Sequence, residues 1–528
     1  MSAIDRSSLA ASVSILALGI VTSYTAIGDD NTTLPSLETQ NAIRALPVAT
    51  PSTPPGHKPD YLDILILPSG PVSLNLLDIY PLGLDSSSDV SRYNDYPLSE
   101  NLKSSPFAAR NSMILRFEPD ALPSQVRDYV DRLDLRVVQT FPEIGAIEIE
   151  VDLKSYVSSQ MAGSTPREAN QALFLGLVAA SEYFQSDPIV RSAAPDLLLG
   201  NQQDSGTTVD NLLSPVSVII SEPEETINWG VIDTEANRLW SHSETHEAVV
   251  IGVLDTGFAE HEDLHFVESL IGMTAHDHGN HVAGIACGRH NGRGIRGVLP
   301  NCSIRARLVT APLSTKALLM LDFDDMEVLN VSIGYDWHRK NINPDLPASE
   351  PVRKLVAGSA EPLLPVLERA DEKGEVIFSA AGNDSLGLSN PISVKYASPF
   401  NWAAVTAREE GIAQSGVIVE AHDIDGRRAP FSNTGGHLSC PGVNIKSAVA
   451  FDPQGRGPHP SVYGTMSGTS MASPHCAAGY LLFRLIRPEY SSLEAVDCLR
   501  RSSHTSTSNT PILRLTQATD ACPKKREN

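Results

Sequence analysis

The sequence predicts an α/β fold, a parallel sheet covered by helices on both faces, preceded by a small α+β domain. Three observations support this prediction. In the C-terminal half, short and strongly apolar runs such as AVVIGVLD and EVIFSAAGN alternate with helix-like stretches. Strands without a polar face must be covered on both sides, which is typical of parallel sheets. Upstream, the segment from Ser112 to Gly200 has the order strand, helix, strand, helix, strand.

The N-terminus carries Arg6 and then a mostly apolar run from Leu9 to Val21. This run is shorter than the roughly 20 apolar residues that cross a membrane. Residues 1–26 are therefore predicted to be a signal peptide, which indicates a secreted or periplasmic protein. A membrane anchor formed by residues 9–21 and an ordinary N-terminal helix stay open, because Tyr24 stands where a cleavage site prefers a small residue.

Residues 27–108 show little pattern and include the Pro-rich stretch LPVATPSTPPGHKPD, which is typical of an extended linker. The α+β domain is predicted at residues 109–200. Its strands include SMILRFEPD and AIEIEVD, and its helices lie in PSQVRDYVDRLDL and REANQALFLGLVAASEYFQ. Residues 201–226 are polar and low in pattern, and such a linker is a natural place for proteolytic cutting.

The length and the net charge of the chain limit what kind of protein it can be. The chain has 528 residues, of which 41% are hydrophobic, so it is too long for one ordinary domain and can bury at least one large core. Its formal net charge is -23, and no cluster of Lys and Arg stands out beyond the terminal KKR. Because a nucleic acid is bound through a basic face, no nucleic-acid partner is expected.

Six cysteines allow up to three disulfides in an oxidising compartment, and no CxxC pair is present. Cys498 with Cys522 is the pairing to test first. Cys287 and Cys476 lie in apolar, small-residue contexts, so the simplest interpretation makes both of them buried free thiols. The sequence leaves the pairing open.

Two short motifs indicate hydrolytic chemistries that the rest of the chain does not support. HEDLH, at residues 261–265, matches a zinc pattern, but Glu268 and Ile271 replace the glycine and histidine of its extended form. The motifs DTG at Asp255 and DSGTT at Asp204 suggest two carboxylates that share a proton. Asp204, however, follows no apolar strand, and the two motifs lie too close together for two lobes.

A third pattern lies in YGTMSGTSMASPHCAAGYLLFRL, where Ser470 stands among small residues that let a substrate approach the backbone. Pro474 is expected in the first turn of the helix that follows. Ser470 would then lie at a helix N-terminus, where amide groups and the dipole favour a developing oxyanion. A serine needs a base, and DHGNHVAGIACG supplies His278, again at a helix start.

Two further residues complete this constellation. Asp255 ends the apolar strand AVVIGVLD, and a carboxylate there can orient the imidazole and stabilise its protonated form. Asn383 ends VIFSAAGN, where its side-chain amide can donate to an oxyanion. In parallel sheets, sites form at the carboxyl ends of the strands, which is where both residues are placed.

These segments resemble the subtilisin-like serine proteases, the subtilase family. The blocks VIGVLDTG, HGNHVAGIA, AAGN and GTSMASPH match, as do GIRGVLPNCSI and VLNVSIG, and the order Asp, His, Ser is that of subtilisin. The resemblance covers about Trp229 to Pro488 and implies a peptidase domain at residues 227–515, followed by a tail at residues 516–528. The α+β domain, which ends in DPIVRSAAPD, resembles the inhibitory propeptide of the family.

The resemblance implies a serine endopeptidase that hydrolyses peptide bonds of proteins through an acyl-enzyme. Ser470 is then the nucleophile and His278 the general base, with Asp255 as the orienting carboxylate and Asn383 as the oxyanion donor. The expected partners of this monomer are protein or peptide substrates and its own propeptide. Backbone groups of Ser332, Ile333 and Gly334 would bind the substrate as an added strand. The wall of the S1 pocket would include Ala380, Ala381 and Gly382.

No cofactor is required for this chemistry, although the resemblance suggests a structural calcium ion. Asp263 and Asn291 would be its ligands, since both side chains supply oxygen. Solvated loop residues are the alternative, because Arg289 and Arg293 flank Asn291 and add positive charge beside any cation.

The remaining histidines near these motifs receive structural roles. His281 and His475 are expected to pack in the core, since their spacing points them away from the site. In this interpretation, His261 and His265 become loop residues that are exposed or lie near the substrate cleft. The chain departs from the family at Asn280, where Thr is common, and at Cys476, where Val is common.

Two other functions stay open. The chain could keep the subtilase fold and serve as a catalytically silent binding or regulatory protein, for example because its propeptide domain never leaves. A zinc metalloprotease that uses HEDLH is the remote alternative.

Overall fold

The computed structural model describes part of the chain, whose residues fall into two compact units, Met1–Thr32 and Thr33–Asn528. All described residues belong to the second unit, so the predicted signal peptide at residues 1–26 lies outside them. Among the described helices, none is both long and apolar enough to span a membrane. The described ranges are 33–48, 64–66, 107–151, 180–201, 219–220, 225–243, 249–271, 273, 275–300, 302–308, 313–314, 326–334, 357–451, 458–501 and 504–525.

The N-terminal domain is an antiparallel sheet with helices, as predicted. Four of its strands follow the spatial order β5-β2-β4-β3, and β1 (Ile64–Ile66) pairs with β2. Helix α3 (Pro123–Arg132) forms where the sequence predicts it and buries Val126 and Val130. Residues 180–185 are helical, and the earlier part of the second predicted helix lies outside the described residues. The four strands are β2 (Phe107–Phe117), β3 (Val137–Phe141), β4 (Ala146–Glu150) and β5 (Val190–Asn201).

Helix α2 (Leu37–Arg44) is an addition that the sequence pattern does not predict. Ser36 caps it, because its Oγ accepts a hydrogen bond from the Thr39 amide at 3.2 Å. The Thr39 hydroxyl in turn donates to the carbonyl of Ala121 at 2.7 Å, and Ile43 is fully buried. The helix packs on α3, so a segment upstream of the Pro-rich stretch belongs to the N-terminal domain.

The central sheet of the C-terminal half is parallel, as the alternation of apolar runs and helices predicts. Its six strands follow the order β10-β8-β12-β14-β15-β16, and every neighbouring pair is parallel. The strands do not lie in the sheet in the order in which they follow one another along the chain. As a result, β8, which ends at Asp255, and β14, which precedes Asn383, lie on either side of β12. The strands are β8 (Val249–Asp255), β10 (Cys302–Leu308), β12 (Val328–Val331), β14 (Val376–Ala380), β15 (Gly416–His422) and β16 (Leu438–Pro441).

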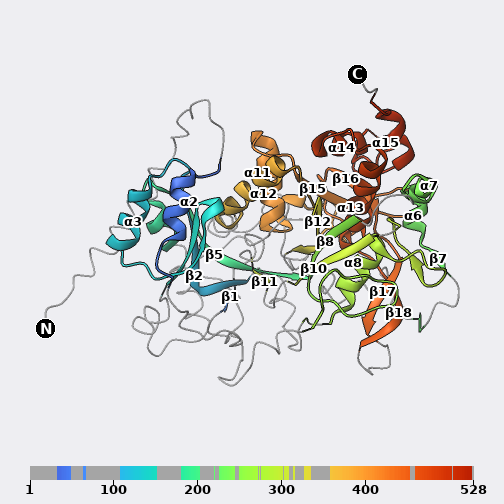
Figure 1. Cartoon of the computed structure of the whole chain (residues 1–528), viewed down its shortest axis with the longest axis horizontal. Helices are drawn as coiled ribbons and strands as arrows, with labels where there is room; N and C mark the ends of the chain where they lie inside the picture. The colour runs from blue at the N-terminus through green and yellow to red at the C-terminus, as the bar shows by residue number, and fades with distance from the viewer. Residues whose placement is uncertain are drawn as a thin grey trace. The chain divides into compact units, whose positions relative to one another are not determined.

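Helices cover both faces of this sheet (Figure 1). Along β14, Val376 and Phe378 pack into one hydrophobic cluster and Ile377 into another, as alternation along a strand requires. The first cluster includes residues of α8 (Asp277–Cys287) and α13 (Thr469–Ile486). The second cluster includes residues of α11 (Leu364–Lys373) and α12 (Pro399–Glu410), and it continues into the core of the N-terminal domain.

Smaller elements complete the C-terminal half. The antiparallel strands β17 (Ile445–Phe451) and β18 (Pro458–Met466) form a hairpin, and β17 packs against α8. The chain continues into α14 (Ser492–Leu499) and α15 (Leu515–Ala521), so the predicted tail, residues 516–528, begins inside a helix. The other described elements are short: β6 (Ile219–Ile220), β7 (Thr226–Ile227), α6 (Trp229–Asp233), α7 (Trp240–Ser243), β9 (Ile295–Arg296), β11 (Leu313–Ser314) and β13 (Ile333–Gly334).

All six cysteines are paired in disulfides. The bond between Cys498 and Cys522 confirms the pairing that the sequence analysis puts first, and it joins α14 to the end of α15. The interpretation of Cys287 and Cys476 as free thiols is wrong. Cys287 is bonded to Cys302 and Cys476 to Cys440. An apolar context identifies a buried cysteine, but the partner lies on another element of the fold, which local context does not reveal.

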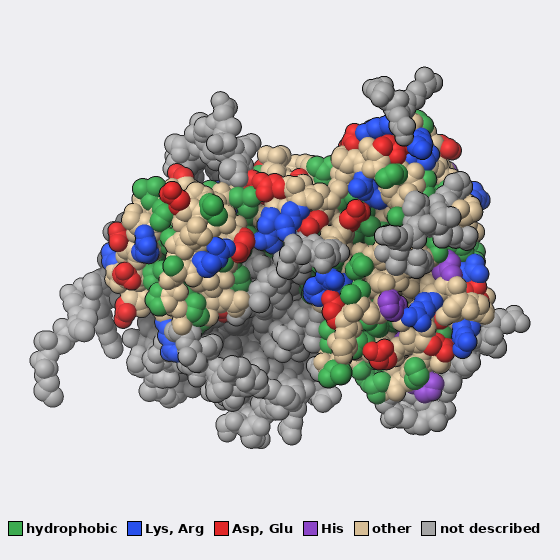
Figure 2. All heavy atoms as spheres, in the orientation of Figure 1, with side chains coloured by type: hydrophobic (Ala, Val, Ile, Leu, Met, Phe, Trp, Pro, Cys, Tyr) green, Lys and Arg blue, Asp and Glu red, His purple; other side chains and the backbone are tan. Residues whose placement is uncertain are grey.

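Charged side chains of both signs are interspersed over the described surface in the view of Figure 2. Neither sign of charge is collected in one large patch on this face. The arrangement agrees with a role of the net charge in solubility.

Candidate active site

Asp255 and His278 form a fully buried pair at the carboxyl end of β8. The His278 Nδ1–H donates to both carboxylate oxygens of Asp255, at 2.8 and 2.9 Å. The amide and hydroxyl of Thr256 also donate to Asp255 Oδ1, at 2.7 and 3.0 Å. These bonds fix the carboxylate and leave Nε2 of His278 as the nitrogen that can accept a proton.

The start of α8 determines where His278 lies. Nδ1 of His276 accepts a hydrogen bond from the His278 amide at 3.2 Å, and Oδ1 of Asp277 accepts from the amides of Ala450 and Phe451 at 2.8 and 2.7 Å. A Cβ at Gly279 would lie 2.0 Å from the carbonyl oxygen of Gly257. Glycine is therefore required after His278, because the helix passes against the loop that follows Asp255.

Ser470 is the second residue of α13 and is almost fully buried. Its Oγ donates to the carbonyl of Ser332 at 3.4 Å, whereas Nε2 of His278 has no hydrogen-bond partner among the described residues. Helices α8 and α13 pack against each other, so the structure brings both residues to the same helix pair without forming the bond between them. Catalytic hydrogen bonds often tighten only when substrate is present.

Pro474 lies deeper in α13 than the sequence analysis expects. It is the sixth residue of the helix, not part of the first turn. Because proline has no amide hydrogen, the carbonyl four residues earlier, that of Ser470, loses its partner within the helix. That carbonyl accepts a hydrogen bond from the Ser332 hydroxyl at 3.2 Å instead. The proline thus allows Ser332 to hold the backbone of Ser470.

Asn383 follows β14 and faces the N-terminus of α13. Its Oδ1 accepts hydrogen bonds from the amide and the hydroxyl of Thr469, both at 2.9 Å. The same hydroxyl accepts from the Gly382 amide at 3.1 Å. These bonds fix the orientation of the Asn383 side-chain amide. Thr469 is a positioning residue that the sequence analysis missed, although its place beside Ser470 is a signal that could have identified it.

The predicted S1 wall lies at the end of β14 and directly after it. Ala380 and Ala381 are fully buried. Gly382 has a positive φ of 98°, and a Cβ there would lie 2.3 Å from Nδ2 of Asn433. Glycine is therefore needed at this position, since the left-handed conformation and the close contact both exclude a side chain. Whether these residues contact a substrate stays a prediction.

The segment predicted to bind substrate as a strand is paired with a strand of the N-terminal domain. β13 pairs antiparallel with β5, Ile333 opposite Asn201 and Gly334 opposite Gly200. On its other edge, β5 pairs with β11, Leu313 opposite Leu199. The last residues of the N-terminal domain therefore lie as a middle strand between two strands of the C-terminal half, and one of these strands directly follows Ser332.

HEDLH is not helical, which removes the geometry that a zinc site on a helix needs. His261 donates from Nε2 to the Val462 carbonyl at 2.9 Å, whereas Nδ1 of His265 contacts the Ser303 hydroxyl at 2.8 Å. His261 is buried, so it is not the exposed loop residue that was one of the two expectations, and its place near the cleft stays a prediction. Among the described residues, no group of three or more His, Cys, Asp and Glu side chains could hold a metal ion.

The predicted calcium ligands are engaged in other bonds. Asp263 is buried and its Oδ2 accepts from the Ile295 amide and the Tyr463 hydroxyl, at 2.8 and 2.9 Å. Asn291 turns its amide nitrogen towards Asp263 Oδ1 at 3.4 Å, and its oxygen accepts from the Arg293 amide at 3.1 Å. Burial raises the pKa of the Asp263 carboxyl. Both side chains are thus engaged in bonds within the chain, and calcium binding stays a prediction.

Four buried histidines are held neutral by their surroundings. Burial lowers the pKa of His281 and His437 to about 3 and that of His261 and His475 to about 4. His281 and His475 are fully buried, as the sequence analysis expects, with His281 Nε2 contacting the Ile445 carbonyl at 2.9 Å.

These histidines predict acid destabilisation. In the unfolded chain each binds a proton near its ordinary value of 6.5, and in the folded chain only near 3 to 4. The contribution of these histidines to the free energy of unfolding is therefore fully present above pH 6.5. It is lost as the pH falls towards 4, by up to about 1.4 kcal/mol per pH unit for each histidine. Urea unfolding of a Ser470→Ala chain across this pH range measures this slope. His437→Gln should lower the slope by about a quarter; an equal slope in both chains would contradict the assignment.

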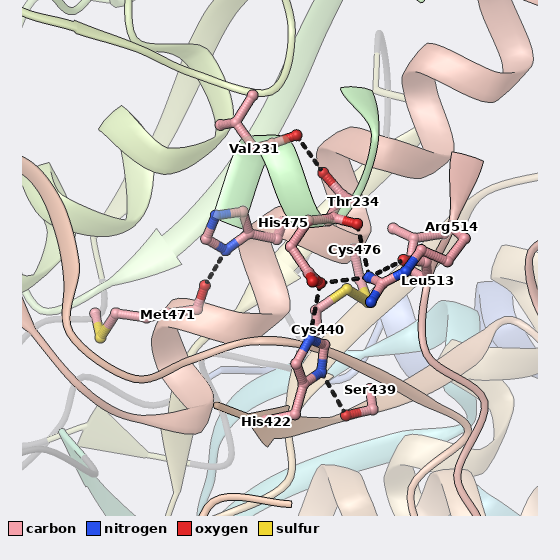
Figure 3. The surroundings of a disulfide bond; sticks show 11 residues. Val231, Thr234, His422, Ser439, Cys440, Met471, His475, Cys476, Leu513 and Arg514 are labelled. Atoms are coloured by element: carbon pink, nitrogen blue, oxygen red, sulfur yellow. Dashed lines mark hydrogen bonds and ion pairs between the residues drawn. A yellow bond between two sulfur atoms is a disulfide. The ribbon is translucent and has the colours of Figure 1, made fainter. Parts of the chain in front are cut away.

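The disulfide between Cys440 and Cys476 anchors α13 to the edge strand β16 (Figure 3). Beside it, Nδ1 of His422 contacts the Ser439 hydroxyl at 2.9 Å, and Nε2 contacts Asp233 Oδ2, also at 2.9 Å. Arg514 donates to the Asp233 carbonyl at 2.6 Å. Burial by itself would raise the pKa of Asp233, but bonds from His422 and Arg514 hold it below its usual value. His422 and Ser439 of this second Asp, His and Ser set are fully buried, and both ring nitrogens of His422 are engaged, while Asp233 also binds Arg514.

Removing this disulfide should destabilise the protein. We expect Cys440→Ala with Cys476→Val to lower the free energy of unfolding by about 2–4 kcal/mol, because the bond closes a loop in the unfolded chain. Its span of 36 residues exceeds the 24 residues between Cys498 and Cys522. The double change Cys498→Ala with Cys522→Ala is the matched control and should cost slightly less. Urea unfolding measures both; no loss in the first variant would refute the expected anchoring.

Comparison with known proteins places the chain among peptidases. A family model described as the subtilase family matches residues 246–517. The minor extracellular protease Epr of Bacillus subtilis is 27% identical over 325 residues, which are 58% of this chain and 43% of that protein. An alkaline protease of Alkalihalobacillus alcalophilus and subtilisin Savinase of Lederbergia lenta are each 27% identical over 291 residues, 53% of this chain and 65% and 92% of theirs. The chain thus spans less than two thirds of the length of the first two.

Proposed function

Because the chain belongs to the subtilase family, we propose that it is a serine endopeptidase that hydrolyses peptide bonds of proteins through an acyl-enzyme. The observation that carries this proposal is the buried Asp255 and His278 pair, joined at 2.8 and 2.9 Å, beside the helix that begins with Thr469 and Ser470. This arrangement leaves one imidazole nitrogen free to accept a proton, which is the requirement for activating a serine.

In the proposed mechanism, Ser470 Oγ attacks the carbonyl carbon of the scissile bond while His278 Nε2 accepts its proton. Asp255 stabilises the imidazolium and keeps its orientation. The oxyanion accepts hydrogen bonds from the Asn383 Nδ2 and the Ser470 amide. As the tetrahedral intermediate collapses, the carbon–nitrogen bond breaks and the leaving amine takes the proton from His278. A water molecule, deprotonated by the same nitrogen, then releases the acid and restores Ser470.

The local fold supports this oxyanion site. The N-terminus of α13 carries partial positive charge, which stabilises negative charge that develops beside Ser470. Thr469 holds the Asn383 oxygen at 2.9 Å, so the amide group does not need to reorganise when the oxyanion forms. Preorganised donors in a buried site are worth more than the same donors in water.

We further propose that substrates bind as an added strand along Ser332, Ile333 and Gly334, with Ala380, Ala381 and Gly382 lining the S1 pocket. The pairing of β5 with β13 supports this, because an extended segment already occupies that edge. The proposed partners are protein or peptide substrates, with the protein acting as a monomer. Export of the protein is also proposed: one relative is named as extracellular, and three disulfides suit an oxidising compartment.

The N-terminal domain is proposed to be an intramolecular inhibitor. Its strand β5 ends at Asn201, in the position proposed for substrate and one register step short of Ser332. The proposed active site can then cut the chain after β5. If the protein is instead a catalytically silent binding protein, the N-terminal domain never leaves.

Self-processing should therefore create a new N-terminus after Asn201 and before Asn228. Because Ser332 is hydrogen bonded to Ser470, we expect the first cut close to Asn201 rather than near Asn228. Mass spectrometry of the earliest processed chain measures it, and the Ser470→Ala chain, which should stay whole, is the control. A first cut upstream of Asn201 would contradict the proposed binding register.

A serine-directed organophosphorus probe and a metal chelator together test the proposed function. The active protein should lose all cleavage of a general protein substrate on labelling, with the label on Ser470, and should keep it in the chelator. Activity that a chelator abolishes and the probe does not touch would favour the zinc alternative. A full-length chain with neither cleavage nor labelling would favour the silent binding protein.

A further inference from the structure

A second surface joins the N-terminal domain to the peptidase domain, apart from the pairing of β5 with β13. On one side lie Thr33, Arg116 and Arg191, and on the other lie Glu361 and Glu368. We call these five residues the clamp. Next to it, the Ser359 hydroxyl donates to the Pro195 carbonyl at 3.0 Å, and a Cβ at Gly358 would lie only 3.1 Å from that of Ala194. The two domains are therefore closely packed around the clamp.

Arg116 is the centre of the clamp, and its side chain is 0% exposed. Its Nη1 donates to the carbonyl and to Oε1 of Glu361, at 3.1 and 2.9 Å. Its Nη2 donates to the carbonyl of Thr33 at 2.7 Å. Burial lowers the pKa of Arg116 to about 10. A buried guanidinium is tolerated only while these acceptors stay in place.

Glu361 compensates two arginines with one carboxylate. Its Oε1 also accepts from Nε of Arg191, whose Nη1 contacts Glu118 Oε2 at 3.5 Å. The Glu361 side chain is 23% exposed, so water reaches it more easily than it reaches Arg116. Loss of this carboxylate would leave two neighbouring positive charges facing each other, one of them buried.

The segment Thr33–Leu46 closes the clamp from far upstream in the sequence. The Thr33 amide donates to Oε2 of Glu368 at 2.6 Å, and its hydroxyl donates to the same oxygen. Glu368 lies on α11 of the peptidase domain. Further along the segment, Ile43 and Leu46 are buried in the core of the N-terminal domain. The segment therefore contacts both domains.

We propose that the clamp sets how long the N-terminal domain stays bound after the chain has been cut, and that Thr33–Leu46 is a working part of the inhibitor. The proposal rests on the proposed function, since it concerns when that active site becomes free. Separating the domains breaks the bonds of a fully desolvated arginine, and such anchors dominate the energetics of an interface. Changes to them act mainly on the dissociation rate.

Dissociation can be measured without enzyme activity. The full chain with Ser470→Ala receives a recognition sequence for a site-specific protease among residues 203–218, is cut there, and is held by a C-terminal tag while the loss of the N-terminal part is followed. Glu361→Gln should speed this loss by about tenfold or more, because it removes the carboxylate with which the buried Arg116 forms an ion pair. Glu409→Gln, whose carboxylate pairs with Lys395 and is 65% exposed, is the matched control and should change nothing.

A double change separates the clamp from general damage to the fold. Adding Arg116→Met to Glu361→Gln removes the buried charge that has lost its ion-pair partner, so the double variant should release the domain more slowly than Glu361→Gln alone. Equal rates for Glu361→Gln and Glu409→Gln, or simple additivity in the double variant, would overturn the proposal. If the site-specifically cut chain that keeps Ser470 releases its N-terminal domain as expected but the probe does not label Ser470, the proposed function fails while the clamp stands.

The role of Thr33–Leu46 has its own readout in the same complex. A second recognition sequence among residues 49–63 separates this segment from β1 and β2 by cutting the chain between them. After both cuts, the segment should stay with the complex and should leave early when Glu361→Gln is present. Its immediate loss from the unsubstituted complex would show that it is not part of the inhibitor.

Discussion

Replacing Ser470 with alanine is expected to lower kcat on a general protein substrate by about 10⁶-fold, which is the loss that removal of the nucleophile or its base causes in subtilisin itself. The hydroxyl is the only group of the proposed triad that bonds to the substrate, so no neighbouring side chain can replace it. Residual catalysis of about 10³–10⁴-fold over water would come from the oxyanion donors and substrate binding. Initial rates and labelling by the organophosphorus probe measure the effect.

Ser473→Ala is the matched control for this substitution. Ser473 lies on the same helix, one turn after Ser470, and is equally buried. It should keep both activity and labelling, with at most a small change in stability. Activity that persists in Ser470→Ala would reject the proposed nucleophile, and equal losses in both variants would indicate damage to α13 rather than to the chemistry.

Asp255→Asn should lower kcat by about 10⁴-fold, with little change in KM. Both carboxylate oxygens accept from the His278 Nδ1–H in the structure, at 2.8 and 2.9 Å. An amide group would turn an N–H towards Nδ1 and favour the tautomer that carries its proton on Nε2. That nitrogen could then no longer accept the proton of Ser470. Steady-state kinetics of folded, purified protein measures the split between kcat and KM.

Asp263→Asn serves as the control for a buried carboxylate without a catalytic role. Asp263 is 1% exposed and accepts hydrogen bonds from Tyr463 and Ile295, but it contacts neither His278 nor Ser470 in the hydrogen bonds of the described residues. We expect a lower free energy of unfolding and an unchanged kcat. If Asp255→Asn kept the parent kcat, the orienting role of Asp255 would be refuted.

The parallel sheet and the positions of Asp255 and Asn383 could be predicted because they depend on local sequence. An apolar run such as AVVIGVLD is buried on both faces wherever it lies, and a polar residue at its end marks the edge of the sheet. The glycine after His278 is also a local signal, since only glycine tolerates the 2.0 Å approach to Gly257. The structure places these residues where their local environments indicate.

The errors of the sequence analysis concern contacts between distant segments. Cys476 looks like a free buried thiol until β16 brings Cys440 beside it. Pro474 looks like a residue of the first helical turn, but Ser332, far away in sequence, supplies the partner that lets it lie deeper in α13. His261 looks like an exposed loop residue, but it is buried, with its Nε2 bonded to the carbonyl of Val462 on β18. No periodicity or short motif encodes any of these partners.

The amino-acid sequence alone therefore determined the fold class, the order of the catalytic elements and the identities of Ser470, His278 and Asp255 as candidates. Those features follow from burial patterns and backbone requirements that act within a few residues. Only the tertiary structure decided three other features. These are the orientation of Asn383 by Thr469, the clamp around Arg116 and the pairing of β5 with β13. Each of them requires two segments that the sheet topology brings together, and the strength of such contacts depends on how completely the packing excludes water.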